Sequence, residues 1–195
     1  MRKVIVSEFV TLDGVIEAPG GEDSLGERSG WSAPFWSEEA AKWIVEGLLA
    51  SDALLMGRRT YEGHAAAWPS LTDELGLADR MNSLPKYVVS TTLEKVEWNN
   101  SRLIKGNITE EVKKLKHEAG QNILIGGSGD LVHLLMQQNV IDEYQLMVFP
   151  VVVGNGKRLW ISGSEKKALR LVETRTFSTG VVVLSYQPRE ERGGK

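Results

Sequence analysis

The chain contains no cysteine, which excludes disulfide bonds, thiolate metal ligands and cysteine nucleophiles. It has no apolar stretch near the ~20 residues that a membrane-spanning helix needs, and Glu8 interrupts its first apolar run too early for a signal peptide. Neither sign of charge predominates, because 23 lysines and arginines stand against 26 acidic residues. We therefore expect a cytoplasmic protein with no nucleic-acid partner and no membrane partner.

Several familiar motifs are also missing. The sequence has no G-x-G-x-x-G and no G-x-x-x-x-G-K-[ST], so neither a Rossmann dehydrogenase nor a P-loop protein is supported. His64, His117 and His133 lie on separate predicted elements without H-E-x-x-H spacing. No metal site is therefore expected.

The sequence does contain alternating strand and helix patterns. Strands are predicted where apolar and β-branched residues run together, at 4–10, 53–56, 86–90, 122–125, 144–153, 169–177 and 180–186. Helices are predicted where apolar residues recur every three or four positions, after Ser37, from Thr109 to Gly120, and after Ser128 as a helix cap.

This order predicts the α/β fold class, with a mainly parallel sheet, helices on both faces and an antiparallel edge made by the closing strands. No linker or repeat divides the chain. A single domain over residues 1–187 is expected, followed by a flexible charged tail at 188–195.

Three predicted strands end in residues suited to a nucleotide. Ligands of open α/β sheets lie beyond the carboxyl ends of the strands. There, glycines allow close backbone approach, arginines bind phosphate with paired donors, and helix N-termini attract anions. Taken singly, each segment is as well explained by a turn, a cap or a solvated patch. The candidates are Gly57, Arg58, Arg59, Thr60, Ser90, Thr91, Gly126, Gly127, Ser128 and Gly129.

The order of these segments resembles the dihydrofolate reductase superfamily. M-G-R-R-T-Y-E at 56–62, V-V-S-T-T at 88–92 and I-G-G at 125–127 are similar to its cofactor-binding segments. T-L-D-G at 11–14 resembles the opening of the related riboflavin-biosynthesis reductase domains. The chain most resembles stand-alone bacterial proteins similar to the C-terminal reductase domain of the bifunctional riboflavin-biosynthesis deaminase-reductase.

The resemblance implies a three-layer fold of the dihydrofolate reductase type that binds NADPH at the candidates named above. Arg58 and Arg59 would take the 2′-phosphate, and Asp13 and Ile16 would lie beside the nicotinamide. The implied activity is NADPH-dependent reduction of a pyrimidine- or pterin-like heterocycle, similar to that of 5-amino-6-(5-phosphoribosylamino)uracil reductase. Asp13 and Glu39 are the catalytic candidates, with Glu38 as an alternative.

Two positions depart from the family's pattern. Ala41 stands about where dihydrofolate reductases carry an acid on the first helix, and Ile125 stands where riboflavin-pathway domains usually carry one. A nucleotide-binding protein of the same fold without turnover is therefore the second hypothesis. NADPH binding with no oxidation of NADPH across a substrate panel would favour it.

Two apolar groups leave alternatives open. Aromatic residues near the first helix either stack on a planar substrate or belong to the core; they are Trp31, Phe35, Trp36 and Trp43. The apolar run at 146–153 contains Pro150, which favours an edge strand covered by a partner, but a central strand would bury it equally well. We expect the edge strand, and hence a homodimer, as the resemblance also implies.

Overall fold

An eight-stranded mixed sheet runs through the middle of the molecule in the order β4-β3-β2-β5-β1-β6-β8-β7. The computed structural model describes residues 1–21, 23–73, 76–163 and 165–189. Strands from β4 to β6 in this order are parallel, and β8 and β7 add the expected antiparallel edge. The strands are β1 Val4–Thr11, β2 Ser51–Gly57, β3 Lys86–Val89, β4 Ser101–Ile104, β5 Asn122–Gly126, β6 Glu143–Phe149, β7 Leu169–Thr176 and β8 Val182–Pro188.

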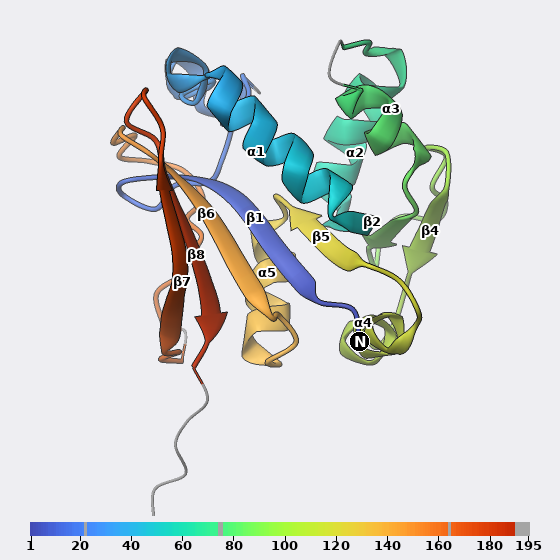
Figure 1. Cartoon of the computed structure of the whole chain (residues 1–195). Helices are drawn as coiled ribbons and strands as arrows, with labels where there is room; N and C mark the ends of the chain where they lie inside the picture. Colours follow the sequence, from blue (N-terminus) through green and yellow to red (C-terminus); the bar gives the residue numbers. More distant parts are fainter. Residues whose placement is uncertain (22, 74–75, 164, 190–195) are drawn as a thin grey trace, which may run out of the picture.

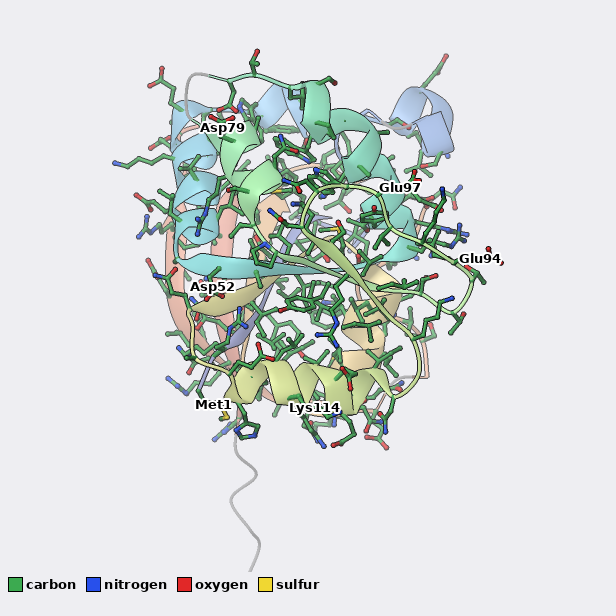
Figure 2. All side chains as sticks on the ribbon, turned by 90° about the vertical axis from the view of Figure 1, so that its right-hand side faces the viewer. Met1, Asp52, Asp79, Glu94, Glu97 and Lys114 are labelled. Atoms are coloured by element: carbon green, nitrogen blue, oxygen red, sulfur yellow. The ribbon has the colours of Figure 1, made fainter. Side chains whose placement is uncertain are left out.

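Five α-helices in the described part of the chain cover the sheet (Figure 1). Helices α1, α2 and α3 lie on one face, and α4 and α5 lie on the other, as the side view also shows (Figure 2). The predicted three-layer α/β fold class is thereby confirmed. The helices are α1 Glu38–Leu49, α2 Arg58–Ala67, α3 Leu77–Ser83, α4 Ile108–His117 and α5 Gly129–Gln137.

Strand β1 is buried on both of its faces. Val4, Val6 and Val10 pack into the cluster beneath α4 and α5. Phe9 points the other way, against the aromatic cluster beside α1, because successive side chains of a strand face opposite sides. Residues at even positions of β1 therefore lie on the α5 side of the sheet.

The predicted helix starts are right in two cases and shifted in one. Ser37 caps α1 as expected, since its Oγ accepts a hydrogen bond from the Ala40 amide at 3.2 Å. Helix α4 begins earlier than predicted, because Asn107 accepts the Glu110 amide with its side chain. Ser128 holds the predicted position immediately before α5.

Two α-helices and one strand were not predicted from the sequence. Helix α2 follows Gly57 directly, where an irregular segment was expected, and it buries only Tyr61. Helix α3 has 7 residues and β4 has 4. Such short or weakly buried elements carry little apolar periodicity, which is the signal that sequence patterns provide.

The expectation that the apolar run from residue 146 is an edge strand is wrong. Strand β6 ends at Phe149, before Pro150, and pairs with β1 on one side and β8 on the other. The central-strand alternative is the one observed. The edge strands of the sheet are β4 and β7, and on β7 Leu171 and Val172 are 49% and 46% exposed.

The end of the chain is described only in part. Pro188 is the last residue of β8, and residues 190–195 of the predicted tail lie outside the described residues. No helix within the described ranges is long and apolar enough to cross a membrane.

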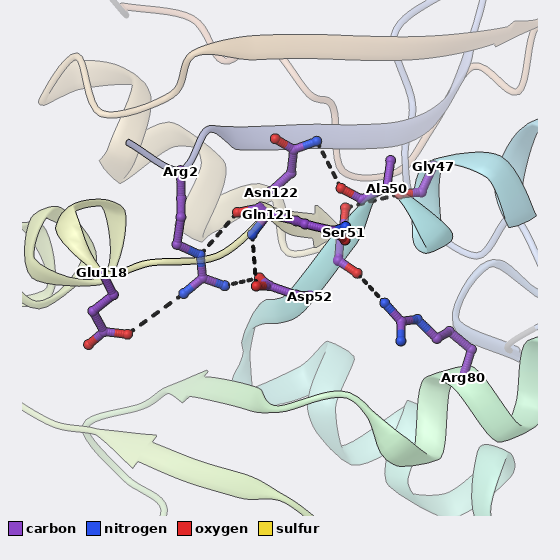
Figure 3. Close-up of polar contacts among 9 residues, drawn as sticks. All are labelled: Arg2, Gly47, Ala50, Ser51, Asp52, Arg80, Glu118, Gln121 and Asn122. Carbon is purple, nitrogen blue, oxygen red and sulfur yellow. Dashed lines mark hydrogen bonds and ion pairs between the residues drawn. The ribbon is translucent and has the colours of Figure 1, made fainter.

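A polar cluster ties the amino ends of the central strands together (Figure 3). Arg2 forms an ion pair with Asp52 and donates from Nε to the Gln121 carbonyl at 3.0 Å. The Asp52 carboxylate also accepts the Gln121 amide at 2.8 Å. These contacts fix β1, β2 and β5 relative to one another at the edge opposite their carboxyl ends.

Candidate functional site

The carboxyl ends of four neighbouring parallel strands meet at one edge of the sheet. Strands β3, β2, β5 and β1 end there at Val89, Gly57, Gly126 and Thr11. The three candidate segments, separated by up to about 70 residues in sequence, are therefore brought to a single edge. This is where ligands of parallel α/β sheets bind.

Ser128 joins the first turns of α2 and α5. Its Oγ accepts a hydrogen bond from the Gly57 amide at 2.8 Å and donates one to Thr60 Oγ1 at 2.8 Å. Ser128 has a left-handed φ of 74°, which is uncommon for a residue other than glycine. Its side chain makes no cap bond to α5, so the prediction of a serine side-chain cap is wrong. The left-handed backbone directs the hydroxyl to α2 instead.

At two of the three glycines between β5 and α5, a side chain would meet a close neighbour. Gly127 has a φ of 73°, and a Cβ added there would lie 3.3 Å from the Thr60 side chain. A Cβ on Gly129 would lie 2.6 Å from Ile16 Cδ1. The structure thus places Ile16 against Gly129, and glycine at 127 and 129 leaves the backbone of the turn open to close approach. The place of Ile16 beside a nicotinamide stays a prediction.

The N-termini of α2 and α5 lie beside each other. The first amides of a helix have no partners within the helix, and its N-terminus carries partial positive charge. On α2, Arg58 forms an ion pair with Glu62 at 3.2 Å. A hydrogen bond from Lys157 and, to a smaller extent, the charge of Arg59 hold the pKa of Asp130 on α5 below its usual range. Two neighbouring helix N-termini with cations beside them suit the binding of an anion, which stays a prediction for this edge.

Ser90 and Thr91 follow the end of β3. Ser90 is buried, and its Oγ accepts the amides of Thr92 and Leu93 at 3.1 and 3.0 Å. Its hydroxyl therefore shapes the turn, while Thr91 is exposed at the same edge. A ribose contact at these residues stays a prediction.

Asp13 holds the loop after β1 in place. Its carboxylate accepts hydrogen bonds from Thr11 Oγ1 at 2.7 Å, from the Val153 amide at 3.2 Å and from the Gly154 amide at 2.9 Å. Arg158 lies 3.6 Å away. The Thr11 bond, followed by the two amides, lowers the pKa of Asp13 to about 2. Asp13 is therefore an ionised acceptor at neutral pH and holds no proton to donate.

Glu39 links α1 to the turn between β7 and β8. Its carboxylate accepts the Ser178 amide at 2.9 Å and the Ser178 hydroxyl at 2.7 Å. Both bonds hold the pKa of Glu39 below its usual value. The catalytic roles of Asp13 and Glu39 stay predictions, and these contacts favour acceptor or positioning roles for both.

An apolar pocket of about 290 Å³ lies beside α1. Ala41, where an acid would hold a pterin, is part of its wall. Asp73 accepts the Leu77 and Ala78 amides at 2.9 and 2.6 Å, so its carboxylate caps α3. Trp36 also contacts the ring of Phe9 on β1, at 6.4 Å between ring centroids, which connects the pocket to the end of that strand. The lining residues are Trp36, Ala41, Ile44, Trp68, Leu71, Thr72, Asp73 and Leu77.

Glu8 is the polar residue of this region that the sequence analysis did not single out. It is 3% exposed in the middle of β1, and its Oε1 has no hydrogen-bond partner in the described structure. Burial raises the pKa of Glu8 to about 8, and the Gly127 amide opposes that effect. The signal in the sequence is one acid within the apolar run at 4–10, but a pattern alone does not show that the acid points inward.

Other parts of the described structure offer less for chemistry. No group of three or more histidine, aspartate or glutamate side chains there could hold a metal ion. A hollow of about 480 Å³ lies along the exposed surface of α4 and is lined by Glu110, Lys113, Lys114, His117 and Glu118. It is remote from the strand ends, and its lining is that of a solvated helix face.

Comparison with known proteins places these features in a family. The RibD C-terminal domain matches residues 2–183. The uncharacterized protein YyaP of Bacillus subtilis (strain 168) is 33% identical over 188 residues, which cover 95% of this chain and 94% of that protein.

Two solved structures share the fold. A putative riboflavin biosynthesis protein from Shewanella sp. PV-4 superimposes with a TM-score of 0.73 at 20% identity, covering 96% of this chain and 99% of that one. A Thermotoga maritima diaminohydroxyphosphoribosylaminopyrimidine deaminase/5-amino-6-(5-phosphoribosylamino)uracil reductase gives 0.64 at 16% identity, covering 96% of this chain and 57% of that one.

Proposed function

Because the chain belongs to the RibD C-terminal domain family, we propose that it is a cytoplasmic NADPH-dependent reductase of a small planar heterocycle. The resemblance to the dihydrofolate reductase superfamily and to riboflavin-pathway reductase domains is confirmed by this membership and by the shared fold. The observation that carries the proposal is the joining of two helix N-termini by Ser128, beside a turn in which Gly127 has a left-handed φ and a Cβ would crowd Thr60.

The residues of this edge suit a dinucleotide phosphate. Amides of Ser128 and Gly129 at the start of α5 would hold the pyrophosphate, as backbone donors at a helix N-terminus do. Gly127, whose own amide bonds Glu8, would let the cofactor approach the turn closely. Arg58 and Arg59 at the start of α2 would hold the 2′-phosphate, which gives guanidinium groups a dianion to pair with. Ile16 would cover the nicotinamide end, since it already packs on Gly129.

The substrate would lie in the pocket beside α1. When bound, NADPH supplies a hydride for the electron-poor carbon of the substrate. Trp36 and Trp68 would orient a planar ring and exclude water from it. Asp13 would keep the loop over the site closed by holding Val153 and Gly154.

Turnover is tested by following NADPH oxidation with a panel of pyrimidines, pterins and quinones. Oxidation with a heterocycle would support the reductase. The alternative of a nucleotide-binding protein without turnover is favoured by Ala41 in the pocket wall and by the two ionised acids, Asp13 and Glu39. NADPH binding with no oxidation across the panel would select that alternative.

Replacing both Arg58 and Arg59 by alanine is expected to weaken NADPH binding by about 10- to 100-fold and NADH binding much less. Only NADPH loses a charge-assisted contact, worth about 1.5–3 kcal/mol per hydrogen bond. Fluorescence titration of both cofactors measures the difference. Arg170→Ala on β7 is the matched control, because it removes an arginine far from this edge. Equal losses for the two cofactors would contradict the 2′-phosphate assignment.

We also propose that the protein is a homodimer, through the β7 edge in place of β6. Strand β7 has one unpaired side, and exposed edges with apolar residues such as Leu171 and Val172 favour pairing with a second copy. Light scattering at micromolar concentration is expected to give twice the 21.6 kDa of one chain. Leu171→Lys with Val172→Lys should shift the mass to that of one chain. A wild-type mass near 21.6 kDa would refute the dimer.

A further inference from the structure

A buried acid lies directly beneath the glycine turn. Glu8 is on the central strand β1, opposite Leu146 of β6, and the preceding residue Ser7 pairs with Gly126 of β5. Its side chain is on the α5 side of the sheet with Val6 and Val10, whereas Phe9 faces the aromatic pocket. Glu8 is therefore separated from the proposed substrate pocket by the sheet and adjoins the proposed pyrophosphate position.

The charge state of Glu8 is set by burial. The buried carboxyl has one oxygen, Oε1, without a partner, and the Gly127 amide is the one group that favours its ionised form. Its pKa of about 8 leaves it largely neutral at pH 7. A buried carboxylate this close to a bound phosphate would be strongly repelled, since the interior screens charge poorly.

No charged neighbour in the described structure supplies another cause for the raised pKa of Glu8. Strand β5 carries no titratable residue, and β6 carries Glu143 and Tyr144 near its start. On α5, Asp130 bonds Lys157 at 3.0 Å, and His133 contacts the Leu159 carbonyl. Burial therefore accounts for the raised pKa of Glu8, and the Gly127 amide makes the shift smaller.

We propose that Glu8 is a positioning residue that stays protonated while an anion occupies the glycine turn, so that cofactor binding is coupled to one proton on this carboxyl. The inference rests on the proposed NADPH site and adds a pH control to it. Ionisation of Glu8 in the absence of cofactor would place a negative charge under Gly127 and oppose rebinding.

The test is the affinity for NADPH between pH 7 and 9.5, a range above the phosphate titration near pH 6. The affinity of the wild-type protein for NADPH is expected to fall about 30-fold over this range. If binding requires one proton on Glu8, the affinity falls tenfold for each pH unit above a pKa near 8. Calorimetry in two buffers with different ionisation enthalpies should show uptake of one proton above pH 8. Glu8→Gln should change less than about twofold over the range, because its amide cannot ionise.

Glu94→Gln is the matched control, since Glu94 is exposed and lies on a loop at the surface (Figure 2). It should keep the wild-type pH response. If the wild type binds NADPH at pH 7 and Glu8→Gln loses affinity with rising pH to the same extent, the inference is overturned. The proposed function would still stand. No NADPH binding at pH 7 would overturn the proposed function and this inference with it.

Discussion

Gly127→Val is expected to abolish binding of NADPH and of NADH while the protein still folds. Gly127 has a φ of 73°, and a Cβ there would lie 3.3 Å from the Thr60 side chain. Valine adds two more carbon atoms at a backbone conformation that β-branched residues avoid. The turn would have to move, and its amides would no longer point at the pyrophosphate. Fluorescence titration measures binding, and circular dichroism follows the fold.

The strain of valine at positive φ needs its own control. Gly106 has a φ of 102° and open space around its Cβ position, just before α4. Gly106→Val should lose a similar stability, about 1–2 kcal/mol, and bind cofactor normally. If folded Gly127→Val binds NADPH with wild-type affinity, the turn between β5 and α5 is not part of the site.

The free energy of unfolding is expected to fall as the pH rises from about 4.5 to 8, because of Glu8. Its pKa is raised from 4.5 to about 8 on folding, so the folded chain binds a proton that the unfolded chain has released. The stabilisation is complete below the pKa that Glu8 has in the unfolded chain. It is lost as the pH rises to the pKa that Glu8 has in the folded protein. The slope is about 1.4 kcal/mol per pH unit, or roughly 5 kcal/mol in total.

Glu8→Gln should lack this slope. Urea unfolding at pH 5, 6, 7 and 8 should therefore show the free energy of unfolding of the variant rising relative to that of the wild type as the pH increases. Lys86, whose pKa burial lowers to about 8, is present in both proteins and cancels in the difference. Glu94→Gln should parallel the wild type. A constant difference between wild type and Glu8→Gln from pH 5 to 8 would show that Glu8 is ionised in the folded protein throughout.

Much of this site could be predicted because it depends on local sequence. A strand followed by glycines or arginines places those residues at the carboxyl edge, whichever strands are neighbours. The places of Gly57, Gly126 and Gly127 at this edge are predictable in this way, and their contact with a cofactor stays a prediction. The direction of the Ser128 hydroxyl could not be found, because it depends on a left-handed φ and on Thr60, 68 residues earlier in the chain.

Glu8 and β6 show a second limit of prediction from sequence patterns. A strand buried on both faces is apolar at nearly every position and shows no alternation of polar and apolar residues. Its sequence therefore does not tell whether an acid such as Glu8 is buried or exposed. The run ending at Phe149 had the composition of a core strand, and Pro150 suggested an edge only because the strand was expected to continue through it. Strand neighbours are set by tertiary pairing over long separations, which composition does not encode.

The position of β1 has a consequence for synthesis on the ribosome. Its neighbours are β5 and β6, so Val4 pairs with Ile123 and Thr11 with Phe149. Strand β1 therefore waits for more than a hundred further residues before either partner is made. At about 5–20 residues per second, it stays unpaired for roughly 5–30 seconds. During that interval its apolar side chains have no strand partner, and Glu8 remains in water until the centre of the sheet closes around it.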